Sequence, residues 1–195
     1  MHTASLHRSL WRHLVAAIVL LAANVVSAAA LVPVPLRAAI LIRSAGYERN
    51  FAEREGDAVL AVVVDRSGTS ASDGLAMAAA FGKLLSETQI AGRRTKVVQI
   101  AYQDKGKTLA ELRSQQAEIV YFGYGLENAA RDVSNDDSGL KRILICANGA
   151  DVEVGCSIGV EVAEDKPRLV LNLKQANAVG LRFPPELLRL ARIVR

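Results

Sequence analysis

Residues 155–159, Gly-Cys-Ser-Ile-Gly, have the G-x-S-x-G spacing that presents a nucleophilic serine in many hydrolases. Such a serine needs a histidine as its general base and a sharp turn from a strand into a helix. All three histidines, His2, His7 and His13, lie in the first 13 residues. That segment resembles an export signal, and Ser157 lies in a β-rich run. The pattern therefore predicts glycines used in packing rather than a hydrolase.

The first 30 residues have the order of a secretory signal peptide. Arg8 and Arg12 precede an uncharged apolar run over 14–26, and small residues follow it. We predict cleavage near residues 28–30, which releases the chain into the periplasm without stable membrane insertion. The alternative is an uncleaved anchor, because the chain carries no charge from residue 14 to residue 36 and that length can span a bilayer.

The composition of residues 31–195 predicts one non-catalytic domain. The chain has 195 residues, of which 51% are hydrophobic and 23% charged, in the range of a single folded domain after the signal. Removal of Arg8 and Arg12 lowers Lys plus Arg from 24 to 22 against 20 Asp plus Glu, a net charge of +2. This balance argues against nucleic-acid binding. Without histidine, we expect no enzyme activity, no metal and no cofactor; the remaining alternative is a carboxylate enzyme using Asp65 with Asp73 or Asp104.

Apolar runs and helical patterns alternate along most of this domain. The expected order of strands and helices is 36–45 (helix), 58–64 (strand), 73–87 (helix), 95–102 (strand), 108–116 (helix), 118–122 (strand), 126–133 (helix) and 142–146 (strand). Strands that alternate with helices favour a parallel sheet covered on both faces. We therefore predict a three-layer α/β/α fold with a mostly parallel sheet.

The last third of the sequence changes character. Residues 156–162 and 169–173 flank a segment with turn residues, which predicts an antiparallel hairpin at the sheet edge. Pro184 and Pro185 then suit a helix start. We predict a terminal helix from Pro184 with an apolar stripe of Phe183, Leu187, Leu190, Ala191 and Val194.

Cys146 and Cys156 are the only cysteines. An even count, an oxidising compartment and a short intervening loop favour a structural disulfide between them. Redox signalling or a pair of free thiols are the alternatives.

Several polar side chains follow the expected strands at their carboxyl ends, where ligands bind in parallel α/β sheets. Ser67 and Thr69 precede the helix 73–87, while Tyr102 and Tyr124 follow later strands. A small-molecule binding or sensory domain with these four residues lining its pocket is the alternative function.

Residues 169–194, Leu-Val-Leu-Asn-Leu-Lys-Gln-Ala-Asn-Ala-Val-Gly-Leu-Arg-Phe-Pro-Pro-Glu-Leu-Leu-Arg-Leu-Ala-Arg-Ile-Val, resemble the end of the YfiR/HmsC family. The resemblance extends over 36–195 and is most specific in the last 30 residues. It implies a non-catalytic periplasmic repressor that binds the periplasmic domain of an inner-membrane diguanylate cyclase. That repression lowers cyclic di-GMP, exopolysaccharide output and biofilm formation. The resemblance also implies a homodimer, and an outer-membrane lipoprotein that sequesters the repressor.

Two departures from the family concern the partner. Many relatives have an aromatic residue and proline after the first helix, where this chain reads Gly46-Tyr47-Glu48-Arg49-Asn50, and some have four cysteines rather than two. Positive charge gathers near the C-terminus, and we expect Arg189 and Arg192 to contribute to the partner surface.

Overall fold

A computed structural model describes residues 31–66, 71–136 and 140–195. Residues 31–195 form one compact unit, built on a seven-stranded sheet. The strands lie in the order β2 (Thr95–Ala101), β1 (Ala58–Val64), β3 (Ile119–Phe122), β4 (Ile143–Cys146), β5 (Ile158–Ala163), β6 (Lys166–Asn172) and β7 (Ala191–Val194). All neighbouring strands are parallel except β5 and β6. The predicted fold class is confirmed.

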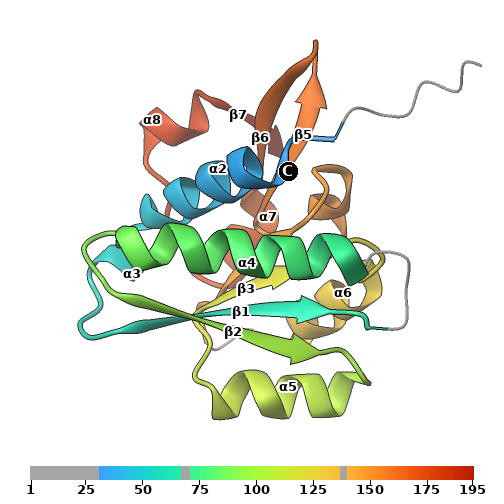
Figure 1. Ribbon diagram of the computed structural model, residues 1–195. Coiled ribbons are helices and arrows are strands. Elements are labelled where there is room, and N and C mark those ends of the chain that lie inside the picture. Colours follow the sequence, from blue (N-terminus) through green and yellow to red (C-terminus); the bar gives the residue numbers. More distant parts are fainter. Residues whose placement is uncertain (1–30, 67–70, 137–139) are drawn as a thin grey trace, which may run out of the picture. The chain divides into compact units, whose positions relative to one another are not determined.

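Helices cover both faces of the sheet (Figure 1). On one face lie α2 (Val34–Gly46), the short α3 (Arg49–Ala52) and α4 (Ala71–Glu87); on the other lie α5 (Lys105–Ser114), α6 (Glu127–Asp136) and the 3-10 turn η1 (Ala150–Val154). Alternate residues of β1 pack into two separate cores, Leu60 and Val62 under α2 and α4, Ala61 and Val63 toward α5 and α6. A strand buried on both faces is apolar at every position, which is why the apolar run at 58–64 predicts such a strand.

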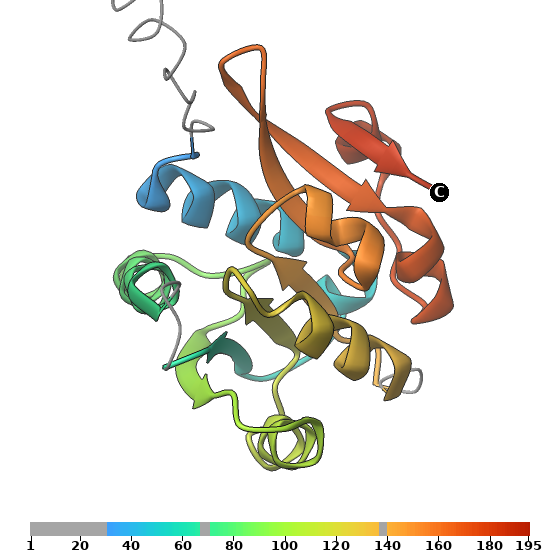
Figure 2. The same cartoon turned by 90° about the vertical axis from the view of Figure 1, so that its right-hand side faces the viewer.

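The hairpin turn between β5 and β6 consists of two residues. Ala163 pairs with Lys166, and Glu164 and Asp165 between them have φ angles of 52° and 59°. Positive φ at both positions is the geometry of a two-residue hairpin turn whose twist matches that of the strands. Figure 2 shows this hairpin projecting away from the helices.

The predicted terminal helix is wrong. Two short helices, α7 (Leu173–Ala178) and α8 (Pro185–Leu188), are followed by β7, which runs parallel to β6 (Figure 2). Pro184 and Pro185 do begin a helix, but Leu190 is 74% exposed and forms no buried stripe. The outer edge of β6 carries backbone groups that need partners, and the β-branched Ile193 and Val194 suit a strand there.

Glu48 holds the C-terminal segment against the start of the domain. Its side chain is fully buried and caps α3 by accepting the Phe51 N–H at 2.6 Å. The same carboxylate accepts the Arg182 N–H at 2.7 Å, while the Arg49 N–H donates to the Arg182 carbonyl at 3.0 Å. Residues 46–50 therefore connect the end of α2 to the C-terminal segment through these hydrogen bonds.

Within the part of the chain that the structure describes, no helix is both long enough and apolar enough to cross a bilayer. The predicted signal peptide, residues 1–30, lies outside the described residues.

Candidate functional site

The carboxyl ends of β1 and β3 mark the point where the strand order reverses, because the chain adds β2 on one side of β1 and β3 on the other. In the order β2-β1-β3, the connection from β1 leads outward to β2 and the next returns to β3 on the other side. Open α/β sheets bind ligands at such points because the connecting loops diverge there. Asp73, in the first turn of α4 after β1, and Tyr124, just after β3, lie here together with Arg37 of α2.

Arg37 is the centre of this polar cluster, although it is only 1% exposed. Its Nη1 donates to the Tyr124 hydroxyl at 2.8 Å, and its Nη2 forms an ion pair with Asp73. The N–H on Nε donates to the sulfur of Met77 at 3.3 Å. The guanidinium also lies 5.2 Å from the centre of the Tyr124 ring, in cation–π range. The three groups from α2, α4 and the loop after β3 are thereby held together.

The cluster contains two buried oxygen atoms without hydrogen-bond partners. They are Oδ2 of Asp73 and the hydroxyl of Tyr121, whose side chain is completely buried. Burial raises the pKa of the Tyr121 hydroxyl, which therefore stays protonated and can donate. Burial alone would lower the pKa of Arg37, but Tyr121, Asp73 and Tyr124 outweigh it and the pKa rises. The Asp73 carboxylate also raises the pKa of the Tyr121 hydroxyl, so the two oxygens are neighbours and the hydroxyl can turn toward Asp73.

A second titratable group lies at the same edge of the sheet. Asp151, in η1 after β4, has its pKa raised to about 6 by burial and by the nearby charge of Glu127. Asp151 also acts on Tyr124, whose pKa is raised mainly by burial. This edge therefore carries a buried cation and a carboxyl group that titrates near pH 6.

Of the four predicted ligand residues, the structure describes Tyr102 and Tyr124, and it places them on opposite faces of the sheet. Tyr124 packs with the core under α2 and α4, whereas Tyr102 packs with the core on the opposite face of the sheet. Ser67 and Thr69 lie outside the described residues. Of the carboxylates considered for catalysis, Asp73 pairs with Arg37, and Asp104 caps α5 by accepting the Lys107 N–H at 2.9 Å.

The predicted disulfide is present between Cys146, at the end of β4, and Cys156, just before β5. Both cysteines are buried. The glycines of the G-x-S-x-G pattern have packing roles, since a Cβ on Gly155 would lie 2.9 Å from the Cα of Arg131 and one on Gly159 would lie 2.4 Å from Val152. Ser157 is fully buried, which agrees with the non-hydrolase interpretation.

The two predicted partner residues differ in their surroundings. Arg192 on β7 pairs with Glu161 at 3.0 Å and with Glu153 at 3.3 Å. Its hydrogen bond to Glu161 is the main cause that raises the pKa of Arg192. Arg189, beside the exposed Leu190, lies on the surface between α8 and β7. Arg192 is thus part of a charge network across β5 and β7, while Arg189 and Leu190 face solvent.

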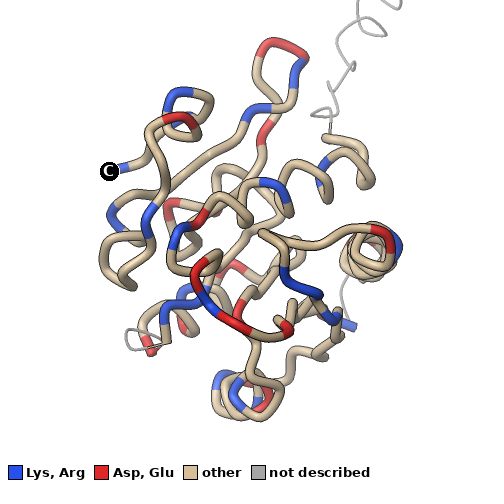
Figure 3. Tube along the Cα trace, turned by 90° about the vertical axis from the view of Figure 1, so that its left-hand side faces the viewer, with Lys and Arg blue, Asp and Glu red and all other residues tan. Residues whose placement is uncertain are grey.

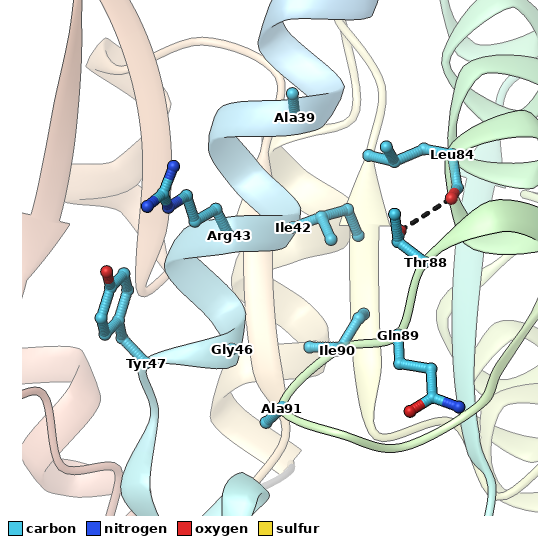
Figure 4. A pocket seen from close by; sticks show the side chains of 10 residues that line it. All are labelled: Ala39, Ile42, Arg43, Gly46, Tyr47, Leu84, Thr88, Gln89, Ile90 and Ala91. Carbon is cyan, nitrogen blue, oxygen red and sulfur yellow. Dashed lines mark hydrogen bonds between the residues drawn. The ribbon is translucent and has the colours of Figure 1, made fainter.

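An apolar groove of about 460 Å³ lies between the C-terminal ends of α2 and α4. Figure 4 shows Ile42, Leu84 and Ile90 along it, with Arg43 and Tyr47 on the α2 side. Tyr47 is 44% exposed. The groove is far more apolar than the Arg37 cluster and offers packing surface rather than hydrogen bonds.

No cluster of three or more metal-ligating side chains occurs among the described residues. Sequence reasoning missed Arg37, because an arginine in an amphipathic helix is expected at the surface. Its partners Asp73 and Tyr124 are 36 and 87 positions away, and no local pattern connects them.

Residues 35–192 match a protein family described as YfiR/HmsC-like. No curated protein matches the sequence. Three solved structures share the fold. The first is an ABC domain in complex with L-Trp from Streptococcus pneumonia, with a TM-score of 0.60 and 14% sequence identity. The second is the ligand-free, open structure of CD0873, a substrate binding protein with adhesive properties from Clostridium difficile, with a TM-score of 0.56 and 16% identity, and the third is a conserved domain protein from Vibrio cholerae O1 biovar eltor, with a TM-score of 0.56 and 14% identity.

These matches cover 84%, 75% and 84% of this chain but only 60%, 57% and 60% of the three solved chains. The protein thus spans a little over half the length of each. At this level of identity, the likeness concerns the fold alone.

Proposed function

The chain belongs to the YfiR/HmsC-like family, and from this premise we propose that it is a periplasmic repressor of an inner-membrane diguanylate cyclase. Members of the family are periplasmic regulators of diguanylate cyclase signalling. In this proposal the protein binds the periplasmic domain of the cyclase and holds the enzyme inactive. Cellular cyclic di-GMP, exopolysaccharide output and biofilm formation then fall.

The observation that carries the proposal is the extent of the family match. It spans 35–192, nearly the whole described unit, and so includes every helix and strand except the ends of α2 and β7. The side chains considered for catalysis suit a binding protein, because Asp73 and Asp104 have structural partners and Ser157 is buried. The proposal also includes homodimerisation and sequestration by an outer-membrane lipoprotein.

We place the cyclase contact on the C-terminal surface, defined as Arg189, Leu190 and Arg192. β7 is the last strand of the sheet order, so one side of its backbone faces away from the sheet. Leu190 is 74% exposed and is the most exposed large apolar side chain of the described residues. An apolar residue between two arginines suits a partner that presents an apolar contact with acidic residues around it.

The first test is cellular cyclic di-GMP in wild type, in a deletion strain and in the deletion complemented with the intact gene. We expect the nucleotide to rise on deletion and to fall on complementation. Complementation with Arg189→Glu plus Leu190→Glu should fail, while Arg131→Glu, an exposed change on α6, should succeed. Unchanged cyclic di-GMP after deletion under several growth conditions would remove the repressor function.

The second test is direct binding of the purified chain to the periplasmic domain of the cyclase. Calorimetry should detect a complex that the Arg189→Glu, Leu190→Glu variant weakens and the Arg131→Glu variant does not. Equal affinity of both variants would remove the C-terminal surface while leaving the repressor function standing. Light scattering of the free chain gives the oligomeric state.

Small-ligand sensing is the second candidate function, and the Arg37 cluster is the observation that favours it. The buried oxygens of Asp73 and Tyr121 lie where open α/β sheets bind ligands. A metabolite that binds the native state raises the melting temperature. A metabolite panel should give a stabilising compound whose effect is lost in Tyr124→Phe, which removes a cluster hydroxyl and keeps the ring. If no compound stabilises the chain, sensing at this cluster is excluded for that panel.

A further inference from the structure

The outward side of α2 is apolar, although much of it faces solvent in the part of the chain that the structure describes. Leu36 is 45% exposed, Ala39 is also exposed, and Ile40 is half-buried. Arg37 and Arg43 are the only charged residues of α2, and Arg37 is buried, so the outward side carries one charge, near its C-terminal end. A helix that is apolar on all sides is normally buried on all sides. We therefore expect a partner to cover this side of α2.

The neighbouring helix α4 extends the apolar surface with small side chains. Between Asp73, which pairs with Arg37, and Lys83, no residue of α4 is charged. Figure 3 views the domain from the C-terminal ends of both helices, with α4 seen end-on and mostly uncharged. Small side chains let another helix approach closely. We define the outer helix face by its apolar residues that are exposed or half-buried: Leu36, Ala39, Ile40, Ala76, Ala79 and Ala80.

The apolar groove of about 460 Å³ lies at one end of the outer helix face. The two helices run in the same direction, because Arg37 meets Asp73 near their first turns. Ile42 and Leu84 line the groove near their last turns (Figure 4). Leu36 stands at the opposite, N-terminal end of α2. The face thus has an exposed leucine at one end and an apolar recess at the other.

We propose that the outer helix face is the interface between two copies of this chain, with a two-fold axis near Ala39 and Leu36 of each copy in the groove of the other. This inference rests on the homodimerisation included in the proposed function and assigns it a surface. In a two-fold interface every contact occurs twice with the roles reversed, so one face can supply both the leucine and its recess. The same rotation places Arg43 and Lys83 of the two copies at opposite ends of the interface, which avoids like-charge repulsion.

The size of the outer helix face is sufficient for such an interface. With 13 residues, α2 is about 20 Å long, and the 17 residues of α4 make about 25 Å. Two helices side by side, each about 10 Å wide, give a face of about 400 Å² in projection. The accessible area is larger than the projection, since side chains stand out from the surface. It therefore approaches the range of about 600 to 1,000 Å² that each partner buries in a stable interface.

The first test measures the dimer dissociation constant of the purified exported chain by sedimentation equilibrium, with no cyclase present. Leu36→Glu places a carboxylate in the partner's apolar groove and should raise the constant by about tenfold or more. Leu140→Glu is the matched control, because Leu140 is 47% exposed and lies before β4, outside this face. It should leave the constant within about twofold of wild type.

A second pair of variants tests the two-fold arrangement. Ala39→Glu alone, and Ala39→Arg alone, bring like charges together near the axis, so each should weaken the dimer. A one-to-one mixture of the two brings opposite charges together and should form a mixed dimer that is tighter than the dimer of either variant. Circular dichroism confirms that the variants are folded, as expected for changes at an exposed helical position.

The proposal is overturned if the wild-type chain remains a monomer at every concentration measured, or if Leu36→Glu and Leu140→Glu affect the dimer equally. A mixture of the Ala39 variants that is no tighter than its components overturns the two-fold arrangement. A monomer that binds vesicles of phosphatidylethanolamine and phosphatidylglycerol, and loses that binding in Leu36→Glu, would assign the face to a lipid surface instead. Because no cyclase takes part, these outcomes are separate from the cyclic di-GMP test, and failure here leaves the repressor function standing.

Discussion

Replacing Arg37 with methionine tests whether the buried polar cluster acts as one unit. Methionine keeps an unbranched chain of similar length but removes the guanidinium. The Asp73 carboxylate, whose side chain is 20% exposed, then loses its counter-charge, and the Tyr124 hydroxyl loses the donor at 2.8 Å. Breaking a buried ion pair from one side destabilises a protein by about 3 to 5 kcal/mol. We expect Arg37→Met to lower the free energy of unfolding by that amount.

The double variant decides whether the loss of stability comes from the unpaired charge or from altered packing. Asp73→Asn alone leaves the guanidinium of Arg37, which is 1% exposed, without its counter-charge, and should be destabilising by a similar amount. Arg37→Met with Asp73→Asn removes both charges, and we expect a loss of only about 2 kcal/mol. The two single losses would then greatly exceed the loss of the double variant.

Urea unfolding of the full chain at pH 7 measures all three variants, with the denaturant slope checked for two-state behaviour. Arg131→Met is the matched control, because Arg131 is exposed and, within the described ranges, its side chain bonds only to that of Asn128, at 3.3 Å. It should change the stability by about 0.5 kcal/mol or less. If Arg37→Met loses no more than this control, or if the single losses simply add, the cluster is not a coupled ion pair.

Three further predictions concern other parts of the domain. The disulfide closes a loop with a sequence separation of 10, and closing such a loop stabilises the folded state by about 2.7 kcal/mol. Reductant should therefore lower the melting temperature by about 8 °C. An unchanged melting temperature with both thiols shown to be free would contradict this. Asp151 has a native pKa of about 6 against an ordinary 3.8, so the folded state keeps a proton that the unfolded state releases, and stability falls as the pH rises between these values. Because Asp151 is partly exposed, we expect Asp151→Asn to stabilise the protein by about 1 kcal/mol at pH 7 and not at pH 4 in urea unfolding; an equal effect at both pH values would refute the assignment. The double variant Glu164→Asn, Asp165→Gly places residues that tolerate positive φ in the β5–β6 turn. Calorimetry should record a rise of about 3 °C in melting temperature. A fall would mean that the acidic side chains stabilise the turn.

The layered core was predictable from sequence because its signals are local. The run Ala58–Val64 is apolar at every position and bounded by Asp57 and Asp65, so β1 was predicted with its observed ends. The cysteines lie ten positions apart on neighbouring elements, and their pairing was predictable too. Such features need no knowledge of distant parts of the chain.

The features that sequence reasoning missed depend on distant partners. Leu190, Ala191 and Val194 have helical spacing, and only the open edge of β6 explains why β7 is a strand. Likewise, Arg37 is buried because α2 crosses α4 next to Tyr124. In each case the deciding contact forms only when the sheet is assembled.

The strand order has a consequence for how the protein is made. After β1 and β2, every later strand joins the sheet on the same side in the order in which it leaves the ribosome, from β3 to β7. A nascent chain can therefore extend a finished sheet one strand at a time, without inserting a late strand between earlier ones. Of the described strands, β7 is the last to be added, and it covers the outer edge of β6. Removal of β7 would leave the outer edge of β6 without its hydrogen-bonding partner, and such an open edge can pair with another chain.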